Sequence, residues 1–165
     1  MHRFATQTLA ITALITTAFI SGCGKKEVKP DESALPSTID ADVNSMGDSD
    51  NGKANGLQTI NFPYDSFVLD SSAKQKLKAN ADLLKEKSSF KIQVEGHCDE
   101  RGGIQYNLAL GEKRANAVRS YMAEIGINTE RMSTISFGKE RLLDPAGTDE
   151  AHAKNRRANF VVTGK

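Results

Sequence analysis

The alternation of apolar and polar residues changes character at about residue 57, and from there it predicts a series of helices and strands. Apolar residues recur at helical spacing over residues 71–87 and about 105–125, which indicates two amphipathic helices. The residues expected to face inward are Ala73, Leu77, Ala81 and Leu84 in the first helix, and Leu108, Ala115, Val118, Met122 and Ile125 in the second.

Four shorter stretches are typical of strands. In FKIQVEG, for example, Phe90, Ile92 and Val94 fall on one face because successive strand residues point to opposite sides. A further short helix is expected over 150–155. The four predicted strands cover residues 57–62, 90–96, 132–138 and 159–164.

The ends of the two long helices carry recognisable signals. Asp70 or Ser71 is expected to cap the first helix, and Gly126 to end the second in a left-handed conformation. The resulting order, β-α-β-α-β-(α)-β, predicts an α+β fold. We expect its helices to pack on one face of a four-stranded mixed sheet.

The first 22 residues are typical of a signal peptide. His2 and Arg3 make a basic start, an apolar Thr-rich stretch follows, and small residues precede Cys23. A transmembrane anchor is the alternative, but a spanning helix needs about 20 strongly apolar residues, and this stretch is shorter and contains Thr and Gln. Export followed by cleavage is therefore the prediction.

The segment ISGC resembles the bacterial lipobox, an aliphatic residue and two small residues before a cysteine. The resemblance implies that Cys23 carries lipid and becomes the new N-terminus. Gly24 stands where many inner-membrane lipoproteins have Asp. The implied location is the outer membrane, with a lipid anchor and the folded part in the periplasm.

Residues 24–56 are polar and rich in Pro, Ser, Asp and Gly, with almost no periodic apolar positions. Such a segment buries too little surface to offset its chain entropy. We therefore predict three parts: a cleaved signal peptide over 1–22, lipidated Cys23 with a flexible tether over 23–56, and one domain over 57–165.

The overall composition excludes some kinds of partner. The 22 Lys and Arg nearly balance the 21 Asp and Glu, aromatic residues make up 6% and Trp is absent, so a nucleic-acid partner is not expected. With two cysteines in the chain and lipid on Cys23, Cys98 has no disulfide partner within the chain.

The motif GHCDERGG raises the question of catalysis or metal binding. His97 and Cys98 are neighbours at a strand end, so their side chains should point to opposite sides and cannot form a nucleophile–base pair. The histidines and Cys98 lack the spacing of a zinc site. We predict neither an enzyme nor a bound metal or other cofactor.

Asp99 and Arg114 suggest binding instead. Asp99 begins a glycine-bearing loop before the second helix, and Arg114 lies two to three turns into that helix. A carboxylate can accept from an ammonium group and a guanidinium fork can hold a carboxylate, so together they suit a zwitterion. A structural salt bridge between the two residues explains the spacing equally well.

The stretch VEGHCDERGGIQYNLALGEKRANAV resembles the signature of the OmpA-like peptidoglycan-binding domain family. Its residue pattern is closest to that of the peptidoglycan-associated lipoprotein branch, Pal. The likeness covers about residues 60–162, including ISFGKE and KNRRANF. The family's ligand is the stem peptide of the cell wall, whose diaminopimelate side chain ends in an amine and a carboxylate on one carbon.

The resemblance implies roles for individual residues. Asp99 matches the aspartate that holds the ammonium group and Arg114 the arginine that holds the carboxylate. Positions lining the pocket or close to the ligand are Tyr64, Asp65, His97, Cys98 and Leu110. Residues with supporting or rim roles are Asn107, which braces the loop, Arg101, which reaches peptidoglycan or lies in solvent, and Arg157 of the motif Asn155-Arg156-Arg157.

The chain departs from the family pattern at Pro63, at Cys98 and in the longer loop 139–157. In Pal that loop region helps to contact the periplasmic protein TolB, so this departure bears on TolB binding rather than on wall binding. The expected function is noncovalent binding of peptidoglycan by an outer-membrane lipoprotein of the Tol-Pal system, acting in envelope integrity and cell division. The alternative is an envelope scaffold that binds proteins and has a vestigial pocket.

Overall fold

The structure is a computed structural model that describes residues 47–164 of the chain. The predicted signal peptide, the lipidation of Cys23 and the tether as far as residue 46 lie outside the described residues. Within the described range, none of the helices combines the length and the apolar character that crossing a membrane requires.

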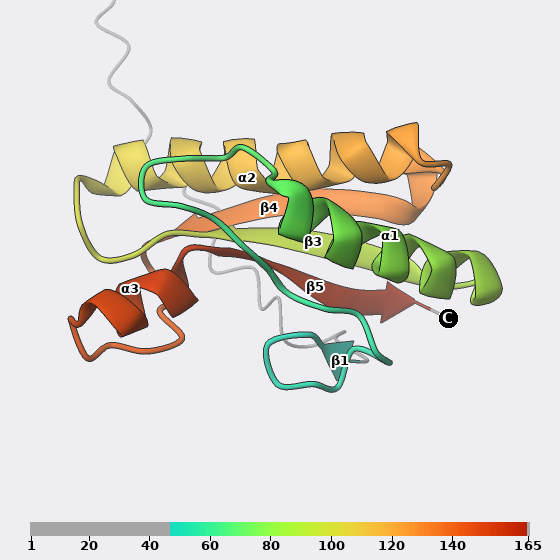
Figure 1. Ribbon diagram of the computed structural model, residues 1–165, viewed down its shortest axis with the longest axis horizontal. Coiled ribbons are helices and arrows are strands. Elements are labelled where there is room, and N and C mark those ends of the chain that lie inside the picture. The colour runs from blue at the N-terminus through green and yellow to red at the C-terminus, as the bar shows by residue number, and fades with distance from the viewer. Residues whose placement is uncertain (1–46, 165) are drawn as a thin grey trace, which may run out of the picture. The chain divides into compact units, whose positions relative to one another are not determined.

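One mixed sheet and three α-helices make up the described part (Figure 1). The sheet order is β1-β5-β3-β4, with β2 also paired to β5; β3 is parallel to β4 and antiparallel to β5. The elements are β1 (Gly47–Asp48), β2 (Ile60–Asn61), α1 (Ser71–Glu86), β3 (Lys91–His97), α2 (Ile104–Glu124), a 3-10 helix (Thr129–Arg131), β4 (Met132–Gly138), α3 (Asp149–Asn155) and β5 (Arg157–Gly164). The predicted α+β fold is confirmed.

Residues 47–56 belong to the domain, although the sequence placed them in the tether. Gly47 and Asp48 pair with Val162 and Val161 of β5, and Ala54 is buried in the core. A two-residue strand has no periodicity of its own, so its pairing depends on a partner more than a hundred positions away in the chain.

The predicted helix ends are confirmed. Asp70 caps α1 by accepting a hydrogen bond from the backbone N–H of Ala73 at 2.7 Å. Gly126 follows α2 with φ +97°, the left-handed conformation that favours glycine. The short predicted strand 57–62 is reduced to β2, while the strands predicted over 90–96 and 132–138 correspond to β3 and β4.

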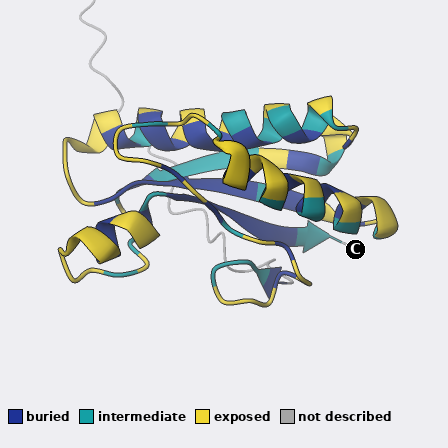
Figure 2. Cartoon of the chain, viewed as in Figure 1, coloured by how far each residue is buried: buried dark blue, intermediate teal, exposed yellow. Residues whose placement is uncertain are grey.

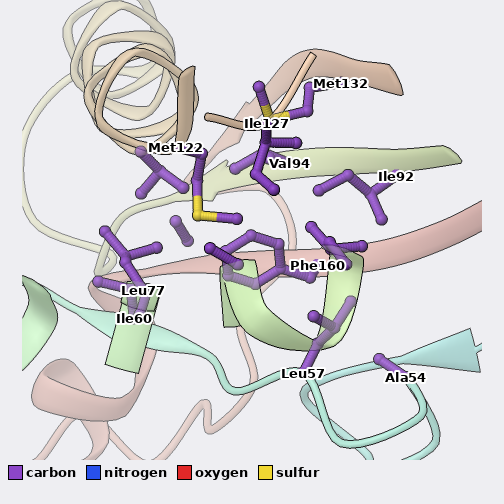
Figure 3. Close-up of a cluster of buried hydrophobic side chains, with 14 of the residues drawn as sticks. Ala54, Leu57, Ile60, Leu77, Ile92, Val94, Met122, Ile127, Met132 and Phe160 are labelled. Carbon is purple, nitrogen blue, oxygen red and sulfur yellow. The ribbon is translucent and has the colours of Figure 1, made fainter. Parts of the chain in front are cut away.

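The hydrophobic core lies between one face of the sheet and the two long helices (Figure 3). Ile92 and Val94 of β3 and Phe160 of β5 pack against Leu77 of α1 and Met122 of α2. Figure 2 shows β3 and β5 almost wholly buried, with the exposed positions of the helices turned outward. Because alternate strand residues point to opposite faces, Glu95 and His97 lie on the other face, away from this core.

Two glycines set the distance between α2 and β3. A Cβ added to Gly96 would overlap the carbonyl oxygen of Gly111, and a Cβ on Gly111 would overlap the hydroxyl of Ser136. The helix therefore rests directly on the strand backbone. This close approach brings the next turn of α2, which carries Arg114, over the end of β3.

Candidate functional site

The site begins where β3 ends and the chain turns into α2. Cys98 continues the sheet by donating its backbone N–H to the carbonyl of Gly138 at 2.7 Å. Asn107 ties the following loop down, since its Nδ2 donates to the carbonyls of Arg101 at 2.7 Å and Gly103 at 3.1 Å. The predicted bracing role of Asn107 is confirmed, and Gly102 supplies the left-handed turn with φ +88°.

This loop, the loop 62–70 and the first turns of α2 surround a cavity of about 160 Å³. Five of the seven residues predicted to bind or lie close to the ligand line it, and so do five others. The lining residues are Tyr64, Asp65, Asp99, Leu110 and Arg114, together with Arg101, Gly102, Tyr106, Asn107 and Arg156.

Arg114 is fully buried and holds the wall of the cavity together. Its Nε donates to the carbonyl of Ser66 at 2.9 Å, Nη1 to the carbonyl of His97 at 2.8 Å and Nη2 to the carbonyl of Pro63 at 3.2 Å. Nη1 also lies 3.4 Å from the sulfur of Cys98. Burial lowers the pKa of Arg114, yet a guanidinium remains charged in proteins. One buried cation thus joins the loop 63–66 to the end of β3.

Asp99 has different partners. Its oxygens accept from Arg101, at 3.2 Å from Nε and 2.6 Å from Nη2, and from Nη1 of Arg156 at 3.2 Å. Burial alone raises the pKa of Asp99, but the hydrogen bonds from these two arginines outweigh it and hold the pKa below its ordinary value. The direct salt bridge between Asp99 and Arg114 is not formed; each residue has its own partners and both border the cavity.

Exposed aromatic residues form the rim of the cavity. The guanidinium carbon of Arg101 lies 4.2 Å from the centre of the Tyr64 ring. The Tyr106 hydroxyl donates to Asp65, whose backbone is left-handed at φ +51°. Sequence reasoning named Tyr64 and Asp65 but missed Tyr106. The pattern YNLALG places Tyr106 one position before the bracing Asn107, in the first turn of α2, where it can reach the loop 62–70.

Arg156 was matched to the family motif without a role, and the structure places it on Asp99. Its Nε also donates to the carbonyl of Phe62 at 3.1 Å. The neighbouring Arg157, for which a structural or rim role was expected, is buried and pairs with Asp50 at 2.7 Å. Arg156 ends α3 and Arg157 begins β5, and the two neighbouring arginines bind carboxylates of different segments, Asp99 and Asp50.

His97 and Cys98 do not line the cavity. Their side chains point to opposite sides, as predicted: Cys98 Sγ contacts the carbonyl of Asn107 at 3.3 Å, whereas the His97 ring pairs with Glu95 at 3.4 Å and stacks on Phe137. The backbone contribution expected of His97 goes to Arg114 instead. Their side chains lie behind the cavity wall, and their predicted place near a ligand stays a prediction.

The electrostatics of these two residues suit a structural role. Burial raises the pKa of the Cys98 thiol, so the thiolate that a nucleophile or metal ligand requires is disfavoured. Burial lowers the pKa of His97, which keeps the ring neutral. Across residues 47–164, no group of three or more His, Cys, Asp or Glu residues is arranged to hold a metal ion.

Comparisons with known proteins agree with the fold. The model of the OmpA family matches residues 61–156. The peptidoglycan-associated lipoprotein of Brucella melitensis is 37% identical over 152 residues, covering 92% of this chain and 90% of its own length. The one of Agrobacterium fabrum is 34% identical, covering 94% and 88%. The crystal structure of the peptidoglycan-associated lipoprotein from Burkholderia pseudomallei matches with a TM-score of 0.61 at 36% identity, covering 63% of this chain and 88% of that one.

Proposed function

The chain belongs to the OmpA family, and from this premise we propose that it binds peptidoglycan noncovalently through the diaminopimelate of the stem peptides. Its relatives are peptidoglycan-associated lipoproteins, which makes a binding protein of the bacterial envelope the appropriate class, rather than an enzyme. The observation that carries the proposal is the cavity that Asp99 and Arg114 border from different elements.

The charges around the cavity suit a ligand of mixed charge. Two carboxylates, Asp65 and Asp99, stand near three guanidinium groups, Arg101, Arg114 and Arg156. An anion alone would meet the carboxylates, and a cation alone would meet the guanidinium groups. A ligand that carries an ammonium and a carboxylate on one carbon can satisfy both, and the free end of diaminopimelate has this arrangement.

Arg114 retains donor capacity for such a ligand. A guanidinium has five N–H groups, and the contacts with three carbonyls and one sulfur account for four of them. In the described part of the chain, this leaves one N–H of Nη2 for an acceptor in the cavity. The ligand's carboxylate would bind there, while its ammonium group would donate to Asp99 in a site shielded from water, where charge-assisted hydrogen bonds are strong.

The remaining features of the function follow from the N-terminal motif and the family. We propose that lipid on Cys23 anchors the chain in the outer membrane and that the segment before the domain spans the gap to the cell wall. By its likeness to Pal, the protein would act with TolB in the Tol-Pal system, in envelope integrity and cell division. The loop 139–157, which is longer than in Pal, lies in the region where Pal contacts TolB.

The test is binding of the purified chain to a stem peptide that contains diaminopimelate, measured by calorimetry, and to isolated peptidoglycan by sedimentation. Asp99→Asn keeps the shape of the side chain but removes its charge, and we expect it to weaken binding by about 2 kcal/mol or more. Asp82→Asn, an exposed position on α1, is the matched control and should leave binding unchanged.

A second variant, Arg114→Lys, keeps the buried charge but loses the fork, and should weaken binding by a similar amount. Because Arg114 also holds the cavity wall, its variant is compared with the parent for folding by circular dichroism. If the parent does not bind peptidoglycan, or if Asp99→Asn binds as tightly as the parent, the proposal fails. A domain that binds proteins of the envelope would then be the better description.

A further inference from the structure

The carboxylate proposed to receive the ligand's ammonium group already holds a cation of the protein. Arg101 donates to both oxygens of Asp99, from Nε at 3.2 Å and from Nη2 at 2.6 Å, and its backbone N–H adds a third bond at 3.2 Å. Parallel bonds from a guanidinium fork to a carboxylate are among the strongest polar contacts in proteins. A ligand ammonium group and the Arg101 side chain therefore require the same oxygens.

The two arginines bound to Asp99 differ in how firmly they are held. The side chain of Arg156 is 15% exposed and is fixed by a second bond, to the carbonyl of Phe62. The side chain of Arg101 is 39% exposed, and the other contact that the described residues give it is the face of the Tyr64 ring. Tyr64 is itself 62% exposed. Arg101 is thus the partner of Asp99 that is more exposed and has fewer other contacts to lose on moving into solvent.

We propose that Arg101 is an internal competitor that occupies Asp99 until a ligand's ammonium group displaces it. This inference rests on the proposed function and deepens it. A site closed for part of the time binds its ligand more weakly, in proportion to the open fraction. The competing Arg101 also makes the site selective for ligands that carry an ammonium group. A ligand without one offers nothing to replace the bonds that Arg101 gives up.

If Arg101 competes with the ligand for Asp99, replacing Arg101 should increase the affinity for the ligand. Arg101→Gln should bind a stem peptide containing diaminopimelate about two- to fivefold more tightly than the parent, since an ion pair with a partly exposed member is worth up to about fivefold in an equilibrium constant. The gain should appear in the association rate, because the open site becomes more abundant while the bound complex keeps its contacts. A residue that merely supports the loop would not change the association rate in this direction.

The experiment measures association and dissociation of the purified chain with the stem peptide by surface plasmon resonance. Arg141→Gln is the matched control, since Arg141 is another partly exposed arginine, with its guanidinium 3.8 Å from the centre of the Phe137 ring. A second probe is the same peptide with its side-chain amine acetylated. The inference is supported if Arg101→Gln binds the free-amine peptide more tightly and faster than the parent does. Arg141→Gln should show no such gain, and neither should the acetylated peptide.

Other outcomes overturn it. Equal or weaker binding of the free-amine peptide by Arg101→Gln would mean that Arg101 is a direct ligand contact or a bystander, while the proposed function would stand as long as the parent binds. An equal gain for the acetylated peptide, or for Arg141→Gln, would assign the effect to general charge. If the parent binds no peptidoglycan at all, the proposed function and this inference both fail.

Discussion

Two clusters of polar and charged side chains lie on opposite sides of the same sheet, and they differ in how firmly their members are held. The cavity group consists of Asp99, Arg101, Arg114 and Arg156. The back-face group consists of Asp50, Glu95, His97, Arg157 and Asn159, joined by the Arg157–Asp50 pair at 2.7 Å and by bonds to Glu95 from Asn159 at 3.0 Å and His97 at 3.4 Å.

The two groups differ in the freedom of their members. The side chains of both partners of the Arg157–Asp50 pair are less than a tenth exposed, at 5% and 9%. In the cavity group Arg101 is 39% exposed and stands beside open space. If Arg101 exchanges with a ligand as proposed, the cavity group acts as a binding site, whereas the enclosed back-face group stabilises the fold.

The largest expected effect concerns the back-face group, which we expect to stabilise the fold. Arg157→Leu leaves the Asp50 carboxylate enclosed without its partner, so we expect the free energy of unfolding to fall by about 3 kcal/mol or more. Urea denaturation measures the loss. Peptide binding by the folded protein should not change, because Arg157 faces away from the cavity.

The double substitution Asp50→Leu with Arg157→Leu is the control for that prediction. Removing both charges leaves no enclosed charge unpaired, and much of the lost stability should return. A single variant as stable as the parent would show that the back-face pair contributes little.

A smaller effect separates the two groups by pH. Burial lowers the folded-state pKa of His97, so as pH falls from 7 towards 5 the unfolded chain takes up a proton at about pH 6.5 before the folded protein does. Stability should therefore decline over this range. The pKa of Asp99 is also lowered, in the direction that keeps it charged, so its contribution should persist down to about pH 4 and peptide binding should be unchanged at pH 5.

Unfolding at pH 7 and pH 5 tests this, with His97→Gln as the comparison. The variant has no group to titrate at that position, and its decline should be smaller than that of the parent. Equal declines in both proteins would assign the pH dependence to other groups.

The smallest expected effect concerns Cys98, which lies behind the cavity with its sulfur 3.4 Å from Nη1 of Arg114. Its thiol is buried and its pKa is raised, so a thiol reagent should modify Cys98 slowly in the native protein and rapidly in urea. Mass spectrometry of the peptide containing Cys98 distinguishes it from Cys23. Equal rates in both conditions would mean that the wall behind the cavity opens readily.

Much of the fold is predictable from the sequence because it depends on local spacing. The stripe Ala73, Leu77, Ala81 and Leu84 is buried as expected, and the cap at Asp70 is formed. Leu108 and Ile125, expected to face inward, are half-buried near the two ends of α2. The pairing of β1 was missed since Gly47 and Asp48 carry no pattern without β5.

The sequence predicted which residues form the site better than it predicted which of them bond to one another. The spacing and the family motif bring Asp99 and Arg114 to one cavity, yet no local signal pairs Asp99 with Arg156, which lies 57 positions away. The place of His97 and Cys98 near a ligand stays a prediction; both precede the point where the chain leaves the sheet, and their side chains are enclosed there. Partners of a buried charge depend on how distant segments meet, which spacing does not encode.

The contact between Gly96 and Gly111 has a consequence for how such a protein can diversify. Where two backbones touch, no other amino acid fits, so this position leaves no room for gradual change. The loops 63–66 and 99–103 are joined to it but carry their own side chains on the cavity rim. New preferences for cell-wall ligands can therefore arise by amino-acid substitutions in those loops, while the contact between Gly96 and Gly111 stays fixed.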